Sequence, residues 1–140
     1  MEDCIFCKII KGEIPCFKVY EEDKVLAFED INPISDGHTL VIPKRHFENL
    51  WEISGDDLKA IHLASQKIGR AIKEALQATG VAVLQLNGRG VNQTVMHYHL
   101  HLIPRTSGSP ELPVTAWEEL KPGDMEVLKQ TAEKITSAVR

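Results

Sequence analysis

The sequence predicts an α+β domain with a mostly antiparallel sheet, and two observations lead to this prediction. The chain has 140 residues, of which 43% are hydrophobic, which is enough for one compact core. Short strand candidates follow one another across tight turns, and the helical patterns stand apart from them, as is typical of α+β proteins. We therefore expect a single domain over residues 1–140, in which 106–140 form a C-terminal extension.

The first half of the chain predicts one short helix and three strands. The stretch CIFCKIIKG, residues 4–12, forms a helix that a glycine stops. Residues 17–20 and 25–30 are strand candidates joined by the charged turn EEDK. The following stretch DINPISDG is rich in turn residues and predicts a loop. After this loop, HTLVIPKRH predicts a strand that ends at Pro43.

The second half contains the strongest helical signal, at residues 54–79. Side chains recur there at steps of three and four and form one stripe, as on a helix that packs on a core. The stripe consists of Leu58, Ile61, Ser65, Ile68, Ile72 and Leu76. Ser54 is a candidate N-cap and Gly80 a stop signal. Two strands, VAVLQLN and MHYHLHLIP, flank a glycine-rich loop, and a last helix is expected after Pro122.

Composition and charge exclude several classes of function. The formal net charge is −4 and no block of Lys and Arg occurs, so nucleic acid is not an expected partner. No apolar run approaches the roughly 18–20 residues that span a bilayer, so we expect no membrane partner either. The N-terminus lacks the pattern of a signal peptide. Three cysteines, an odd number, argue against a disulfide framework, and together these features predict a cytoplasmic protein.

Half of the six histidines lie in the stretch MHYHLHLIPR, at His97, His99 and His101. On a strand, alternate side chains share a face, so the three rings would line one side while Tyr98 and Leu100 pack into the core. Three interpretations compete. The histidines lie on a solvated strand face, or they bind the metal of a hydrolase, or one imidazole is a nucleophile whose neighbours handle protons and charge.

A resemblance to a known family covers most of the chain. HYHLHLI resembles the signature of the histidine-triad (HIT) nucleotide hydrolases and transferases. The blocks CIFCKIIKGEIP, LAFEDINP, GHTLVIPKRH and NQTVMHYHLHL are similar to family blocks and stand in the family's order. The nucleoside phosphoramidases and the general bacterial members are the most similar branches. The resemblance implies a mostly antiparallel five-stranded sheet with one long helix and a C-terminal helix, and a sheet that continues across a homodimer.

The resemblance also implies catalytic roles. His99 corresponds to the histidine that attacks the α-phosphorus and forms a nucleotidyl-histidine intermediate. His101 is then expected to donate to a phosphate oxygen, and Thr94 to place its hydroxyl near the leaving group. His38 matches the family's upstream histidine near the phosphates, although a histidine at the start of a surface strand would look the same in the sequence.

The same resemblance assigns substrate contacts to seven further residues. They are Asp30 for the ribose hydroxyls, Asn87, Gln93 and Val95 beside the phosphates, and Phe6, Ile9 and Phe28 for an apolar base pocket. Asn92 departs from the phosphoramidase branch, where a glycine is common. From the residues alone, a turn aspartate is the less favoured alternative for Asp30, and core packing is a nearly equal alternative for the three apolar residues.

Cys4 and Cys7 form half of a metal site with C-x-x-C spacing. A structural zinc normally has four nitrogen or sulfur ligands, and His46 and His97 could supply the other two. Some bacterial members of the family have this motif and bind zinc there, so the resemblance implies a structural zinc that takes no part in the chemistry. The alternatives are two half-buried thiols on a helix or a redox pair.

As a whole, the resemblance implies a homodimeric hydrolase that binds a purine nucleotide. It would release a nucleoside monophosphate, AMP in the first place, from a phosphoramidate or a related nucleotidyl substrate. The alternatives are a dinucleoside polyphosphate hydrolase and a nucleotide-binding regulatory dimer with little turnover. A zinc-dependent hydrolase with its metal at His99 and His101 is a further alternative. The physiological substrate and the base preference stay open.

Overall fold

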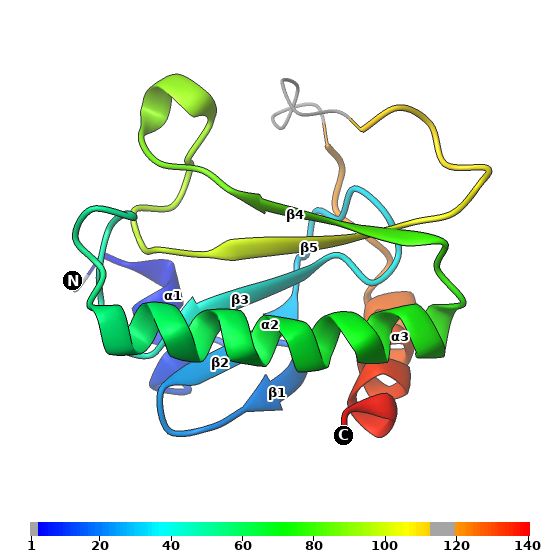
Figure 1. Ribbon diagram of the computed structural model, residues 1–140, viewed down its shortest axis with the longest axis horizontal. Coiled ribbons are helices and arrows are strands. Elements are labelled where there is room, and N and C mark those ends of the chain that lie inside the picture. The colour runs from blue at the N-terminus through cyan, green and yellow to red at the C-terminus, as the bar shows by residue number, and fades with distance from the viewer. Residues whose placement is uncertain (1–2, 113–119) are drawn as a thin grey trace.

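The structure is a computed structural model that describes residues 3–112 and 120–140. Its five strands form one sheet in the order β1-β2-β3-β5-β4, and all neighbouring strands are antiparallel (Figure 1). The strands are β1 (Lys18–Glu21), β2 (Val25–Glu29), β3 (Thr39–Pro43), β4 (Gly80–Gln85) and β5 (Leu100–Arg105). The prediction of an α+β fold with a five-stranded antiparallel sheet is confirmed.

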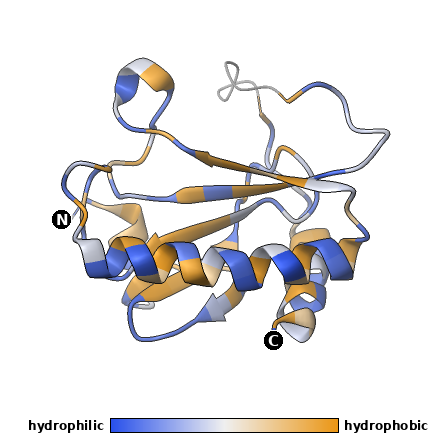
Figure 2. Ribbon diagram, in the orientation of Figure 1, coloured by the Kyte–Doolittle hydropathy of each residue, from blue (hydrophilic) through white to orange (hydrophobic). Residues whose placement is uncertain are grey.

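The two faces of the sheet carry different helices. The long helix α2 (Gly55–Leu76) and the C-terminal helix α3 (Met125–Ala138) pack on one face, and α1 (Ile5–Ile10) lies on the other (Figure 1). The alternation along β2 decides this division, because Val25 and Ala27 join the core under α2 whereas Leu26 and Phe28 join the cluster under α1. Figure 2 shows the matching stripes of polar and apolar residues along α2.

Helix α2 begins as predicted and ends earlier than predicted. Ser54 is its N-cap, and its side chain accepts a hydrogen bond from the N–H of Asp57. The last helical residue is Leu76 rather than residue 79, because Gln77 takes a left-handed conformation with φ 51°. Its N–H bonds back to the carbonyl of Lys73, which closes the helix, and Gly80 is the first residue of β4 rather than a helix stop.

The histidine strand is shorter than predicted. Strand β5 begins at Leu100, so His97 and His99 precede it. The reason lies in the neighbouring strand β3, whose last residue, Pro43, has no N–H to donate to a ladder. The carbonyl of Pro43 accepts from the ring of His97 instead. The alternation nevertheless continues through the segment, since Tyr98 and Leu100 lie in the core.

The structure describes only part of the predicted C-terminal extension. Residues 113–119 fall outside the described residues, and the structure therefore places only the remainder of 106–140. There, Asp124 caps α3, and α3 packs on α2 and β1. Among the described helices, none is long and apolar enough to cross a membrane.

A buried carboxyl group ends β2. The side chain of Glu29 is 1% exposed, and its two carboxylate oxygens accept no hydrogen bond from the described residues. Burial raises the pKa of Glu29 from 4.5 to about 8, although the nearby Thr39 hydroxyl, which donates to the carbonyl of Gly37, opposes this shift. The charges of Asp30 and Asp36 act in the same direction as burial. Ionisation of Glu29 therefore opposes folding. Its favourable contribution is complete below about pH 4.5 and is lost as the pH rises through 8.

We predict that Glu29→Gln reduces the loss of stability at alkaline pH. The wild-type protein should lose on the order of 3–5 kcal/mol of unfolding free energy from this group between about pH 5 and pH 9. The variant should lack that slope, which chemical denaturation at the two pH values measures. Glu133→Gln, on the exposed face of α3, is the matched control. Parallel pH profiles for the wild type and Glu29→Gln would contradict the assignment.

Candidate active site and metal centre

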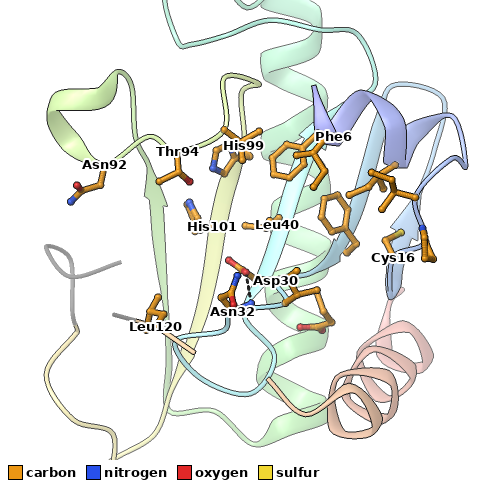
Figure 3. Close-up of a pocket in the computed structure, with 18 residues that line it drawn as sticks. Phe6, Cys16, Asp30, Asn32, Leu40, Asn92, Thr94, His99, His101 and Leu120 are labelled. Carbon is orange, nitrogen blue, oxygen red and sulfur yellow. Dashed lines mark hydrogen bonds between the residues drawn. The ribbon is translucent and has the colours of Figure 1, made fainter. Parts of the chain in front are cut away.

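A cavity of about 470 Å³ opens on the face of the sheet opposite α2 (Figure 3). One end is apolar, where Phe6 of α1 meets Phe28 of β2 edge to face with ring centroids 5.5 Å apart. The other end is polar. Residues that line the whole cavity include Phe6, Ile9, Phe28, Leu40, Asp30, Asn32, Asn92, Thr94, Val95, His99 and His101. The shape suits a ligand with a flat apolar part and a polar part.

His99 presents one ring nitrogen to this cavity in a defined protonation state. Its Nδ1 lies 2.7 Å from the carbonyl oxygen of His97, and because a carbonyl only accepts, Nδ1 carries the proton. Burial lowers the pKa of His99, so the ring is neutral and Nε2 keeps a free lone pair. Phe6 packs its ring edge to face with the imidazole at 5.2 Å. The arrangement provides a neutral nucleophilic nitrogen.

His38 and His101 form a chain of hydrogen bonds with one direction. The backbone N–H of Ile34 donates to Nδ1 of His38 at 3.0 Å, so the neutral ring of His38 carries its proton on Nε2. This Nε2 donates to Nδ1 of His101 at 2.9 Å, which leaves the proton of His101 on its own Nε2. Desolvation lowers the pKa of His38 to about 3 and that of His101 to about 2, so both rings are neutral. His101 lines the cavity, whereas His38 is fully buried behind it.

Asp30 lies midway along the cavity, beside Asn32 (Figure 3). Its Oδ1 accepts the backbone N–H of Asn32 at 2.8 Å, and its Oδ2 is 3.5 Å from Nε2 of His38. Burial raises the pKa of Asp30 to about 6, and the Asn32 hydrogen bond opposes this shift. The carboxylate remains free to accept further hydrogen bonds from a ligand's hydroxyl groups.

The loop before His97 divides the predicted phosphate contacts into two groups. Thr94 and Val95 line the cavity. Gln93 is buried instead, where its Oε1 accepts the N–H of Gly88 at 2.6 Å and its Nε2 donates to the carbonyl of Glu48 at 2.6 Å. Asn87 accepts the N–H of Leu50 at 2.7 Å. Neither lines the cavity, so their contacts fasten the loop that carries Thr94.

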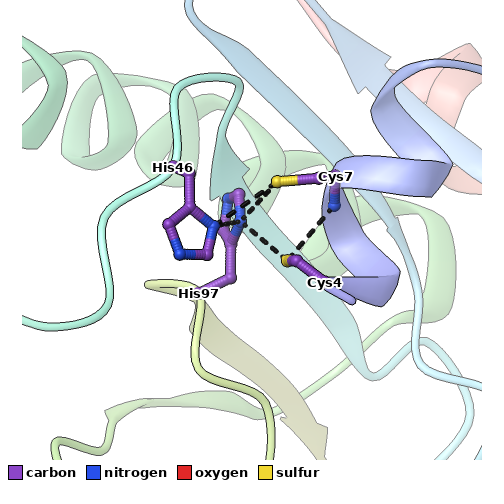
Figure 4. Close-up of side chains that lie close together, drawn as sticks. All are labelled: Cys4, Cys7, His46 and His97. Atoms are coloured by element: carbon purple, nitrogen blue, oxygen red, sulfur yellow. Dashed lines mark hydrogen bonds between the residues drawn. The ribbon is translucent and has the colours of Figure 1, made fainter. Parts of the chain in front are cut away.

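Four predicted ligand residues meet at one point beside the first turn of α1 (Figure 4). Cys4 is the N-cap of α1 and Cys7 lies in its first turn, while His46 comes from the segment after β3 and His97 from the segment before β5. The ring of His97 donates from Nε2 to the carbonyl of Pro43 at 2.8 Å, which leaves a lone pair on Nδ1. That Nδ1 faces Cys4 Sγ at 3.4 Å.

The spacing of the four atoms fits a tetrahedral metal ion. Zn–N bonds of about 2.05 Å and Zn–S bonds of about 2.3 Å place two nitrogens about 3.3 Å apart and a nitrogen and a sulfur about 3.6 Å apart. The two Nδ1 atoms of His46 and His97 are 3.2 Å apart. The sulfur of Cys7 is 3.4 Å from Nδ1 of His46 and 3.7 Å from Nδ1 of His97. This donor set therefore fits zinc.

A second group of possible ligands, Asp30, His38 and His101, fits a metal ion poorly. A ring nitrogen binds a metal through its lone pair. The lone pairs of His38 and His101 accept hydrogen bonds at Nδ1, and both Nε2 atoms carry protons. This arrangement is suited to proton donation into the cavity.

Several cavity residues were missed in the sequence. Leu40 pairs with Phe28 across β2 and β3 and packs in the same cluster, so the register of the hairpin would have identified it. Asn32 and Ile31 follow Asp30 directly and also line the cavity. Whether their side chains face it depends on the conformation of the loop, which the sequence does not specify. Leu120 approaches the cavity from the C-terminal segment, for which the sequence offers no signal.

Comparison with known proteins decides the family, because the model of the HIT domain matches residues 11–108. The chain belongs to the HIT family. The adenosine 5′-monophosphoramidase hnt1 of Schizosaccharomyces pombe is 41% identical to this HIT protein over 137 residues and is covered over 98% of both chains. The histidines of the predicted triad and the upstream His38 lie within the matched part, whereas Cys4 and Cys7 lie before it.

Two solved structures are closely similar to this HIT protein. A Hit-like protein from Bartonella henselae, described as involved in cell-cycle regulation, has a TM-score of 0.88 and 42% identity, with 99% of this chain and 98% of that chain covered. A Zn-bound histidine triad family protein from Mycobacterium smegmatis has a TM-score of 0.83 and 31% identity, with 98% and 93% covered.

We predict fixed tautomers for the buried histidines of the site. Long-range ¹H–¹⁵N correlation spectra should show His99 protonated on Nδ1, and His38 and His101 protonated on Nε2. Because the pKa values of His38 and His101 are about 3 and 2, their signals should stay unchanged from about pH 8 down to about pH 5. The variant His38→Ala identifies the signals of His38 by their loss. It also removes the donor to Nδ1 of His101, so that His101 should no longer be restricted to the Nε2-protonated tautomer. Titration of either ring in this range would contradict the hydrogen-bond chain.

Proposed function

We propose that this protein is a nucleotide hydrolase that releases a nucleoside monophosphate, in the first place AMP, from phosphoramidate or related nucleotidyl substrates. One observation carries the proposal. The neutral ring of His99 is held by its Nδ1 proton with the free lone pair of Nε2 toward a cavity, in which His101 presents a proton. A nucleophile and a neutral donor side by side are what attack on phosphorus requires. The phosphoramidase from S. pombe supports the same reaction class.

Two displacements at phosphorus account for the reaction. In the first, Nε2 of His99 bonds to the α-phosphorus, the bond to the leaving group breaks, and the leaving nitrogen takes one proton from solvent as the amine departs. In the second, water attacks the nucleotidyl-histidine and gives one proton to solvent, the P–N bond to His99 breaks, and the nucleoside monophosphate leaves. The carbonyl of His97 stabilises the positive charge that develops on the ring of His99, and the Nε2–H of His101 donates to a phosphate oxygen.

The cavity provides an apolar region for the base and a carboxylate for the ribose of the nucleoside. The base lies between Phe6, Phe28 and Leu40, whose surfaces suit the flat face of a purine. Asp30 accepts hydrogen bonds from the two ribose hydroxyls. Ile9 and Val95 complete the apolar wall, and the hydroxyl of Thr94 lies on the phosphate side near the leaving group.

The charge of the cavity favours a phosphoramidate over a dinucleoside polyphosphate. Among the described lining residues there is no Lys or Arg, and the pKa of each lining histidine is lowered by burial. A polyphosphate leaving group carries several negative charges that these walls do not match, whereas an amine leaves without negative charge. A regulatory dimer with little turnover would bind AMP equally well but would not need the nucleophile at residue 99.

We further propose that Cys4, Cys7, His46 and His97 hold a structural zinc ion. Zinc at this position would join α1 to the segments after β3 and before β5 and would supply no chemistry to the phosphate. The Zn-bound relative from M. smegmatis and the tetrahedral spacing of the donor atoms support this proposal. A hydrolytic zinc at His99 and His101 is disfavoured, because the lone pair of His101 is engaged with His38.

A homodimer in which the sheet continues across two chains completes the proposal. Strand β4 is an edge strand that pairs with β5 alone among the described strands. Val83 on this strand is 56% exposed. An open strand edge that carries an exposed apolar side chain is usually covered in a native protein. A second copy of the chain, paired through β4, would cover both the edge and Val83.

We predict that His99→Gly abolishes turnover and retains nucleotide binding. Loss of the nucleophile should lower kcat for an adenosine phosphoramidate by about 10³-fold or more. Mass spectrometry of wild-type protein quenched during turnover should find a nucleotide adduct on His99. Isothermal titration of the variant with AMP is the control for an intact cavity. Undiminished hydrolysis by His99→Gly, with no adduct on the wild type, would exclude the covalent mechanism.

We predict that Val83→Lys converts a dimer into a monomer. A charge on the β4 edge opposes pairing with a second copy. Light scattering coupled to gel filtration measures the mass, and Val127→Lys on the exposed side of α3 serves as the control. A wild-type protein with the mass of one chain at micromolar concentration would exclude the dimer.

A further inference from the structure

We propose that the Cys/His cluster controls nucleotide affinity, because a metal ion bound by Cys4, Cys7, His46 and His97 clamps α1 onto the sheet and thereby forms one wall of the base pocket. This inference rests on the proposed nucleotide function and goes beyond a stabilising role for the metal. It assigns the two cysteines and His46 as positioning residues for substrate binding.

Helix α1 is held on the sheet by apolar packing and by this cluster. It has six residues, and isolated helices shorter than about 12–15 residues are marginal in water. Its backbone hydrogen bonds stay within the helix and the residues next to it, and within the described residues none joins it to the sheet. Phe6 is buried, and Ile9 and Ile10 pack partly buried in the same apolar cluster. The fixed position of α1 therefore depends on this apolar packing and on the Cys/His cluster.

The two cysteines of the cluster lie in the turn of α1 that faces the nucleotide cavity. Cys4 is the N-cap of the helix, and its Sγ accepts the N–H of Cys7 at 3.3 Å, so both ligands belong to the first turn. Ile5 and Phe6 lie between these ligands and line the cavity, and Ile9 lines it one turn later. A metal that fixes Cys4 and Cys7 fixes this apolar wall at the same time.

Phe6 joins the two sites directly. Its ring contacts His97 edge to face at 5.8 Å and His99 at 5.2 Å, and it meets Phe28 at 5.5 Å. The ring is 6% exposed and stands between the metal ligand His97 and the nucleotide cavity. Displacement of α1 would remove Phe6 from Phe28 and open the base pocket.

The nucleophile keeps supports that do not require a metal ion. His97 belongs to the cluster through Nδ1, but its Nε2 donates to the carbonyl of Pro43, and the N–H of Tyr98 donates to the carbonyl of Phe47 at 2.6 Å. His99 is held by the carbonyl of His97. Loss of the metal should therefore weaken nucleotide binding and leave the orientation of His99 unchanged, so that KM rises while kcat is retained.

The cluster is accessible from outside the nucleotide cavity. A second cavity of about 330 Å³ is lined by Cys4, His46 and Glu48, and it shares Ile5, Thr94 and Val95 with the nucleotide cavity. A chelator can reach Cys4 and His46 through this second cavity. The metal can therefore be removed before nucleotide is added, and both occupancies can be varied in the same protein.

The test compares the zinc-loaded protein, the same protein after chelation, and the chelated protein after zinc is added back. The dissociation constant of AMP, the KM and kcat for an adenosine phosphoramidate, and amide hydrogen exchange over residues 5–10 are measured in each state. We expect chelation to raise the Kd and KM at least tenfold, to change kcat less than about threefold, and to increase exchange in α1 while β2, β3 and β5 stay protected. Addition of zinc should restore the Kd, the KM and the slow exchange of α1.

Variants make the comparison specific. Cys4→Ala should reproduce the chelated state without recovery on addition of zinc, and Lys11→Ala, at the exposed end of the same helix, should behave as the wild type. An unchanged Kd after chelation would overturn the inference. So would loss of protection throughout the sheet, a fall in kcat at constant Kd, or a failure to bind zinc. A zinc-loaded wild type that does not bind AMP would instead refute the proposed function.

Discussion

The hydrogen bond from Nε2 of His97 to the carbonyl of Pro43 is the constraint on which both sites depend. Pro43 has no N–H, and its carbonyl is occupied by an imidazole, so the β3–β5 ladder stops at Val41 and Leu100. The chain before Leu100 therefore leaves the strand. Nδ1 of His97 faces the cysteines, and its backbone carbonyl is free to hold His99. One side-chain contact thus separates the proposed metal ligand His97 from the proposed nucleophile His99, two residues away.

Burial governs the chemistry of the remaining histidines. Desolvation lowers the pKa of His38, His99 and His101, which keeps all three rings neutral. A neutral ring has one donor and one acceptor, so each hydrogen bond on one nitrogen determines what the other nitrogen can do. The N–H of Ile34 donates to Nδ1 of His38 and so places the proton of His38 on Nε2, whereas the carbonyl of His97 accepts from Nδ1 of His99 and so leaves Nε2 of His99 unprotonated. For this reason Nε2 of His101 carries a proton and Nε2 of His99 keeps a lone pair, although both are histidines of one strand region.

The sequence predicted the order and type of the elements and the identity of the clustered residues, for reasons that are local. Alternation along residues 96–104 separates Tyr98 and Leu100 from the histidines whether or not the ladder forms, so the division between core and site was correct although the strand begins at Leu100. What the sequence could not predict depends on contacts between distant segments. The burial of Gln93 against Glu48 and the approach of Leu120 to the cavity are of this kind. The left-handed Gln77 was also missed, because glycine is the usual residue at such a helix end.

The HIT domain match contains the residues that act on the ribose and the phosphate in the proposed reaction, but not the helix that lines the base side of the cavity. Residues 11–108 contain Asp30, His38, His99 and His101, which act on the ribose and the phosphate in the proposed reaction. Phe6 and Ile9, on the base side, belong to α1, which precedes this region. A short helix on an otherwise open face of the sheet can change its position without disturbing the β3–β5 hydrogen bonds that support the histidines. In the proposed reaction, affinity for the base therefore depends on the attachment of α1, while the sheet holds the histidines that act at phosphorus.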